Sequence, residues 1–120
     1  MEQLCKIRDI QRSIIEFETN FEQCYHICLN EGMLLCSLST AQHLSSGEIG
    51  ELLGLTLSNT SKVIKSVEEK GLIERVVGKK DKRQMYFSLT NKGKKLLSNI
   101  QCKQIEMPKF LKKVMNNFTE

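Results

Sequence analysis

The sequence lacks the features that mark several classes of protein. No apolar run approaches the roughly 18–20 residues of a membrane span, and the first residues lack the basic start and continuous apolar stretch of a signal peptide. The chain has one proline, Pro108, and no internal repeat, low-complexity tract or linker. These absences predict a cytoplasmic protein whose 120 residues form a single domain, 1–120, long enough to bury a core.

Cysteine and histidine are placed in a way that fits neither a disulfide framework nor a metal site. Five cysteines without a signal peptide argue against disulfides. Cys24 and Cys28 have one-turn helical spacing, but His26 would lie on the opposite side of that helix, and no second pair follows at zinc-finger spacing. We therefore expect no metal and no cofactor, and we expect Cys24, Cys28 and Cys36 to be small buried residues.

The groups that catalysis needs are also missing. The two histidines, His26 and His43, are isolated in the sequence. There is no nucleophile elbow, no phosphate-binding loop and no pair of acids with an evident role. The sequence therefore predicts a protein that is not an enzyme.

Charge is unevenly divided along the chain, whose formal net charge is +4. Residues 1–55 carry 3 basic and 8 acidic side chains, residues 56–83 carry 8 and 4, and residues 84–120 carry 7 and 2. An acidic first half and a basic second half favour a face that binds a polyanion such as nucleic acid. A solvated surface with uneven charge is the alternative.

Hydrophobic spacing predicts a mainly helical chain that begins with a long helix over residues 2–25. Apolar residues recur there at intervals of three and four, and the seam is longer than one small core needs. This length favours packing against a helix of a second copy of the chain. Asn30 is predicted to cap a second helix, and the polar residues 39–43 are predicted to form a loop.

Two capping signals mark a helix-turn-helix. Ser45 and Glu48 have the spacing of a capping box, in which each side chain satisfies the other's free backbone amide. Gly54 is predicted to end the short helix that this box opens. Thr56 then caps a further helix that runs to Lys70, so that two helices are joined by a three-residue turn.

A β-hairpin and two more helices are predicted to follow. Residues 72–77 and 84–89 have the composition of strands and are joined by the charged turn 78–83. A fifth helix is predicted over 91–105, and an amphipathic last helix is predicted beyond Pro108. Helices at both chain ends fit a dimer interface, or they pack on their own chain; periodicity does not separate these two cases.

The helix that follows Thr56 has two different faces. At 100° per residue, Thr60, Val63, Ile64 and Val67 are predicted to face the core. The polar side chains of the opposite face and its flank are Ser58, Asn59, Ser61, Lys62 and Lys65. Hydroxyl, amide and ammonium groups suit a helix that enters a major groove of DNA, where Lys binds guanine or phosphate and Asn pairs with adenine. A solvated helix face is the alternative.

The hairpin turn carries a second basic group. Lys79, Lys80 and Lys82 are predicted to neutralise phosphates without reading sequence. Arg83 has a planar guanidinium that fits a narrow minor groove, and Asp81 is close enough in sequence to hold the turn or Arg83 in place. Next to a helix-turn-helix, such a hairpin makes a winged helix.

Five runs of the sequence match the pattern of a known family: residues 44–53, 55–65, 69–75, 81–83 and 89–93. The Asp-x-Arg that ends at Arg83 and the Leu-Thr-x-x-Gly that begins at Leu89 are the more specific pieces. In these runs the chain resembles a MarR-type winged helix-turn-helix transcriptional regulator, over about residues 30–100.

The resemblance implies a homodimer with a DNA-binding lobe at 30–90 and dimerisation helices at 2–25 and 91–120. It implies a repressor that binds a palindromic operator in double-stranded DNA, with the polar face after Thr56 in the major groove and Arg83 in the minor groove. A winged helix used as a protein-interaction module is the alternative. Such a module would show an apolar or acidic face where this chain has Ser, Asn and Lys, which favours DNA.

The resemblance also implies two modes of regulation. Many family members release DNA when a small phenolic or lipophilic effector binds between the dimerisation helices and the DNA-binding lobe. Here that pocket would be lined by Phe17, Phe21, Tyr25 and Met33, although an aromatic row at helical spacing also fits a core. Some members sense oxidants through a cysteine early in the first helix, and Cys5 is the candidate here; an ordinary thiol near a frayed terminus is the alternative.

Overall fold

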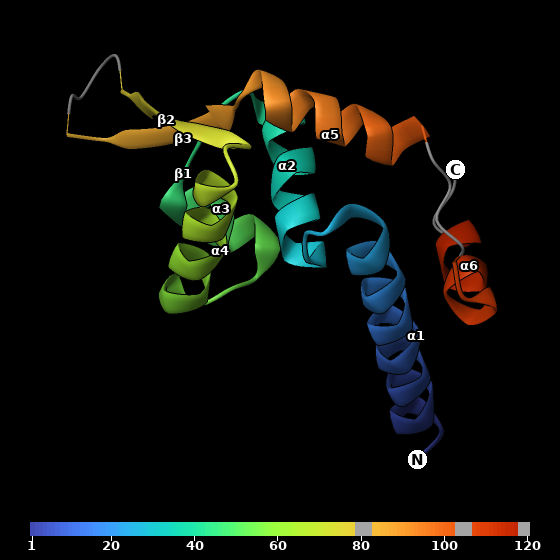
Figure 1. The fold of residues 1–120 in the computed structure, drawn as a ribbon. Helices are drawn as coiled ribbons and strands as arrows, with labels where there is room; N and C mark the ends of the chain where they lie inside the picture. The colour runs from blue at the N-terminus through green and yellow to red at the C-terminus, as the bar shows by residue number, and fades with distance from the viewer. Residues whose placement is uncertain (79–82, 103–106, 118–120) are drawn as a thin grey trace. The chain divides into compact units, whose positions relative to one another are not determined.

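The computed structural model describes residues 1–78, 83–102 and 107–117, which Figure 1 shows as a ribbon. The chain divides into two compact units. The first comprises Met1–Leu29 and Gln104–Glu120, and the second comprises Asn30–Lys103. The prediction of a mainly helical fold with a small sheet is confirmed.

The first unit consists of two helices, α1 (Glu2–Tyr25) and α6 (Lys109–Asn116), which contact each other. Helix α1 confirms the predicted long helix. It ends at His26, which adopts the left-handed conformation (φ 59°) and donates its backbone N–H to the Glu22 carbonyl at 2.8 Å. Helix α6 begins directly after Pro108, and no residue that the structure describes in this helix is fully buried.

Several large apolar side chains of the first unit lie exposed on a single chain. On α1 the exposed fraction is 66% for Leu4, 53% for Ile7 and 61% for Ile15. On α6 it is 51% for Met115 and 38% for Phe110. On α1 the spacing of Leu4, Ile7 and Ile15 places them on one side of the helix, and an exposed apolar face of this kind is typical of an interaction surface.

The second unit contains a helix-turn-helix and an antiparallel sheet. Its elements are α2 (Leu29–Ala41), β1 (Leu44–Ser45), α3 (Ser46–Leu53), α4 (Leu57–Glu69), β2 (Ile73–Val77), β3 (Met85–Leu89) and α5 (Asn91–Cys102). The strand order is β1-β3-β2, with Leu44 opposite Phe87 and Ile73 opposite Leu89. All these elements except β1 were predicted. The buried apolar residues of this unit are Leu34, Leu35, Leu38, Leu44, Ile49, Ile64, Val67, Leu72, Ile73, Phe87, Leu89 and Leu97.

The second helix differs from the prediction at both ends. It begins at Leu29, so Asn30 lies inside its first turn and is not the cap. It continues to Ala41, so the prediction of a loop from residue 39 was wrong. The hydroxyls of Ser39 and Thr40 donate to the Cys36 carbonyl at 2.7 and 3.5 Å, and these local bonds let polar residues remain helical.

The cysteines and the end of α5 also differ from expectation. Cys24 and Cys36 are exposed and Cys28 is half-buried, so the prediction that all three are buried was wrong. In α2 the buried face is taken by leucines, which leaves Cys36 on the outer side. Helix α5 is described to Cys102, and the predicted continuation to Ile105 lies outside the described residues.

The predicted capping box at the start of α3 is confirmed. The Glu48 backbone N–H donates to the Ser45 hydroxyl at 3.2 Å, and the Ser45 backbone N–H donates to the Glu48 carboxylate at 3.0 Å. Hydrogen bonds to its carboxylate, first from the Ser45 backbone N–H and then from the Ser45 side chain, hold the pKa of Glu48 below its ordinary value.

We expect Ser45→Ala to lower the free energy of unfolding by about 1 kcal/mol at neutral pH, because it removes the cap. The difference between variant and wild type should persist above the unfolded pKa of glutamate, about 4.3. It should shrink as the pH falls through the lowered folded pKa, since protonation of Glu48 weakens the hydrogen bond of its carboxylate with the Ser45 hydroxyl, which only the wild type has. Urea unfolding at several pH values measures this, and a difference that grows in acid would contradict it.

Candidate nucleic-acid interface

The turn between α3 and α4 holds the two helices close together. Gly54 adopts the left-handed conformation (φ 68°), and the Leu55 N–H donates to the Gly50 carbonyl at 2.9 Å. A Cβ atom added at Gly50 would lie 2.7 Å from Thr60 Oγ1. Thr60 itself is buried and donates its hydroxyl to the Thr56 carbonyl at 2.7 Å. The close approach of α3 and α4 therefore depends on a glycine and a satisfied threonine hydroxyl.

Helix α4 presents the polar face that the sequence predicted. Its cap is Thr56, whose hydroxyl accepts the Asn59 N–H at 3.1 Å. Thr60, Ile64 and Val67 are buried, and Val63 is half-buried. The residues of the outward face, all exposed, are Ser58, Asn59, Ser61, Lys62 and Lys65. The first turn of α4 has no acidic residue, so the positive end of its dipole is not offset by a carboxylate on that turn.

The wing is formed by β2, β3 and residues 78–84 between them. The two strands pair antiparallel from Ile73–Leu89 to Val77–Met85, and the Gly78 N–H donates to the Gln84 carbonyl at 2.9 Å. Arg83 is exposed and lies two residues before β3 begins. Lys79, Lys80 and Lys82, which were predicted to meet phosphates, lie outside the described residues. Asp81 lies outside them too.

A cavity of about 600 Å³ lies between helix α4, the start of α3 and the wing. Ser61 and Lys65 of the outward face line it, and so do two residues that the sequence did not single out, Ser46 and Arg75. The Arg75 guanidinium donates to the Glu68 carboxylate at 2.8 and 3.1 Å and lies 5.6 Å from the centre of the Phe87 ring. Hydrogen bonding to Glu68 and its charge raise the pKa of Arg75.

The residues predicted to line an effector pocket fall in both units. Phe17, Phe21 and Tyr25 stack along α1, with ring centres 6.1 and 5.1 Å apart. Phe21 is buried, and burial together with the neighbouring Cys24 raises the pKa of Tyr25. Met33 belongs to the second unit and is 39% exposed. The pocket therefore stays a prediction.

Three further sequence predictions concern Cys5, metal ions and membrane spans. Cys5 is exposed near the start of α1, so oxidant sensing by this thiol stays a prediction. Within residues 1–78, 83–102 and 107–117, no group of three or more His, Cys, Asp or Glu side chains is placed to hold a metal ion. No helix among the described residues is long and apolar enough to cross a membrane.

Comparison with known proteins decides the family. The model of the MarR family matches residues 27–85. The HTH-type transcriptional regulator PapX of Escherichia coli is 31% identical, in an alignment that covers 98% of this chain and 82% of PapX. The chain belongs to the MarR family of transcriptional regulators. The predicted family is therefore confirmed, and its members are regulators and not enzymes.

Other relatives agree with this assignment. The uncharacterized HTH-type transcriptional regulator YwaE of Bacillus subtilis is 27% identical over 78% of this chain. The chain spans 54% of the length of YwaE, and 66% of the length of SarZ of Staphylococcus aureus, which is also 27% identical.

Solved structures share the fold. The transcriptional regulator BldR of Sulfolobus solfataricus superposes with a TM-score of 0.75 at 22% identity, covering 97% of this chain and 78% of BldR. A mutant MarR of E. coli complexed with operator DNA gives a TM-score of 0.73 at 21% identity, covering 98% and 85%. The MepR–DNA complex of S. aureus gives 0.64 at 21% identity, covering 92% and 86%. The winged helix-turn-helix predicted from the sequence is confirmed.

Proposed function

We propose that this MarR-family chain is a homodimeric repressor that binds a palindromic operator in double-stranded DNA. The observation that carries the proposal is the outward face of α4, where Ser58, Asn59, Ser61, Lys62 and Lys65 are all exposed. These side chains combine donors and acceptors for base edges with two positive charges for phosphates. The MarR and MepR structures solved with DNA support the same partner for this chain.

The first unit supports a dimer. Its exposed apolar residues on α1 and α6 are of the kind that a second copy would cover. In a two-fold dimer the two α4 helices would enter successive major grooves, with centres about 34–36 Å apart. A palindromic operator follows from this symmetry.

Each wing would add contacts beside the major groove. The lysines at positions 79, 80 and 82 would neutralise phosphates, and Arg83 would reach the minor groove. Ser46 and Arg75 line the same cavity as Ser61 and Lys65, and so does Glu68, whose carboxylate is already neutralised by Arg75; a phosphate at the mouth of this cavity would meet both helices and the wing. We include Ser46 and Arg75 among the DNA contacts.

Release of DNA would require an effector that binds one spacing of the two α4 helices better than the other. The aromatic row of α1, with Met33, is the proposed site for a small phenolic or lipophilic molecule of this kind. An effector that binds both spacings equally would shift nothing, however tightly it binds.

Selection from a random double-stranded DNA library, followed by fluorescence anisotropy at two salt concentrations, tests this function. We expect recovery of a short palindrome bound by two chains, with an affinity at least about a thousandfold above that for scrambled DNA. Weak binding to every sequence with a steep salt dependence would contradict sequence-specific regulation. Capture of a protein partner without any DNA preference would favour the interaction-module alternative.

Two wing variants separate phosphate contacts from minor-groove recognition. We expect Lys79→Ala to weaken binding to selected and scrambled DNA alike and to reduce the salt slope by about one. We expect Arg83→Ala to relax the preference at the flanking minor-groove positions, because the arginine reads groove width. Anisotropy titrations on operators changed at single positions measure both effects, and equal losses on all sequences for both variants would overturn the role of Arg83.

A further inference from the structure

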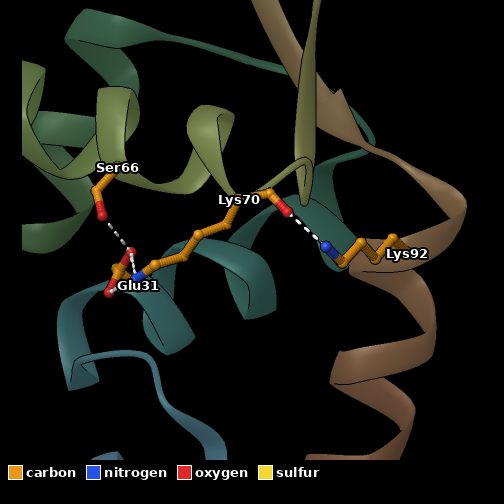
Figure 2. A network of polar contacts seen from close by, with 4 residues as sticks. All are labelled: Glu31, Ser66, Lys70 and Lys92. Atoms are coloured by element: carbon orange, nitrogen blue, oxygen red, sulfur yellow. Dashed lines mark hydrogen bonds and ion pairs between the residues drawn. The ribbon is translucent and has the colours of Figure 1, made fainter.

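Glu31 is a buried carboxylate in the first turn of α2 that no pattern in the sequence singled out. The residue is 3% exposed. Its carboxylate accepts a hydrogen bond from the Ser66 hydroxyl at 2.8 Å and two from the Lys70 ammonium at 2.8 and 3.0 Å, as Figure 2 shows. A charge this far from water needs such partners, because desolvation otherwise disfavours its ionised form.

Both donors come from the C-terminal end of the recognition helix. Ser66 and Lys70 are four residues apart, so they lie on one side of α4, and Ser66 is half-buried there. The outward face lies mainly on the N-terminal half of the same helix. Glu31 therefore holds α4 at the end that the DNA would not meet.

The backbone at this end of α4 has a second anchor in α5. The Lys92 ammonium donates to the Lys70 carbonyl at 2.9 Å (Figure 2), and the Thr90 hydroxyl donates to the Gly71 carbonyl at 2.7 Å. A cation on the terminal carbonyls is favourable because it meets the negative end of the helix dipole. The C-terminus of α4 is thus held through its side chains by Glu31 of α2, and through the carbonyls that follow by Lys92 of α5 and by Thr90, which precedes that helix.

Because a helix is rigid, a change of its angle at the anchored C-terminal end displaces its N-terminal end. Asn59 is seven residues before Ser66, which is about 10 Å along the helix axis. A rotation of roughly 10° at the anchor would move Asn59 by about 2 Å, enough to break a hydrogen bond whose heavy atoms must lie within roughly 3.2 Å. Glu31 is buried whereas the Lys70 side chain is 39% exposed, and the three hydrogen bonds on the carboxylate fix the position of this end of α4 relative to α2.

We propose that Glu31 is a positioning residue for DNA recognition, which fixes through Ser66 and Lys70 the angle at which α4 presents its outward face. This inference rests on the proposed DNA-binding function. Discrimination between sequences then depends on Glu31, whereas general attraction to phosphates does not, because the lysines of α4 and the wing keep their charges when α4 tilts.

The test compares dissociation constants for selected and scrambled DNA, measured well below the unfolding midpoint of each variant. We expect Glu31→Gln to lower the ratio of these constants about tenfold, and Ser66→Ala to lower it several-fold, with less than a twofold change for scrambled DNA. Lys70→Met should lower the ratio as Glu31→Gln does. Lys70→Arg should keep the wild-type ratio, because it keeps the positive charge. Matched controls are Glu18→Gln and Ser39→Ala, which remove an exposed carboxylate on α1 and an exposed hydroxyl on α2.

Amide hydrogen exchange without DNA provides an independent readout. We expect Ser66→Ala, which leaves the ion pair intact, to speed exchange in the C-terminal half of α4 several-fold, with exchange in α3 unchanged. Variants that only lose thermal stability, and keep both the ratio and the exchange pattern, would overturn the positioning role. If wild-type protein does not distinguish selected from scrambled DNA, the proposed function itself fails, and the positioning role fails with it; faster exchange would then show only a structural anchor.

Discussion

Gly93→Ala is expected to lower the free energy of unfolding by about 3 kcal/mol, which is the upper part of the usual range for overpacking. Gly93 lies in the first turn of α5, and a Cβ atom there would overlap the carbonyl oxygen of Leu72. That carbonyl is fixed because it accepts the Thr90 N–H at 3.1 Å. A shift of α5 away from Leu72 would break this bond, so the overlap has no easy relief.

Thermal unfolding measures this effect, with Gly47→Ala as the matched control. A Cβ at Gly47 would meet only the Ser45 hydroxyl, at 4.0 Å. The control should be unchanged or more stable by up to about 1 kcal/mol, since alanine is the better helix former. For a domain of this size the loss at Gly93 corresponds to a midpoint lower by about 10–20 °C. Equal midpoints for the two variants would show that α5 does not pack on Leu72 as described.

Asn59→Ala is expected to weaken binding to the selected operator by about 10–100-fold, the range for losing one bidentate contact to a base. Asn59 is the third residue of α4, and the first turn of a recognition helix is the part that reaches base edges. Binding to scrambled DNA should change less than about twofold, because no charge is removed. Titrations at one fixed salt concentration measure both constants.

Asn99→Ala is the matched control, since it makes the same change at an exposed position of α5. It should leave both affinities unchanged, and size-exclusion chromatography should give the same assembly for both variants and wild type. If the two asparagine variants bind the operator equally well, the side chain of Asn59 does not read a base. The operator position that Asn59 contacts should tolerate any base pair in the Asn59→Ala variant.

The parts of the fold that could be predicted from the sequence are those determined by nearby residues. The capping box of Ser45 and Glu48 and the cap at Thr56 each act over three residues, and both were found where expected. The division of α4 into a buried and an exposed face follows from its period, with Val63, Ser66 and Glu68 half-buried between the two faces. Local signals of this kind are sufficient to locate the helix-turn-helix and its outward face.

The parts that could not be predicted depend on contacts between distant residues. Glu31 meets Ser66 across 35 positions, and no local pattern marks a glutamate for burial. Arg75 lines the cavity beside α4 because β2 contacts that helix and Arg75 pairs with Glu68, which the strand pattern does not encode. The end of α2 was missed because hydroxyl residues favour loops in general, and their bonds to Cys36 became visible only in three dimensions.

The short strand β1 has a consequence for the order in which the protein folds. The β2–β3 hairpin joins residues close in sequence and can form early, whereas Leu44 and Ser45 must find Phe87 and Tyr86 more than 40 positions away. Ser45 also caps α3, so one residue joins the helix-turn-helix to the central strand of the sheet. We therefore expect the closing of β1 onto β3 to be a late event in folding, which joins the wing to α3. Mutations at Leu44 should slow folding less than they speed unfolding, since interactions formed after the transition state act mainly on the unfolding rate.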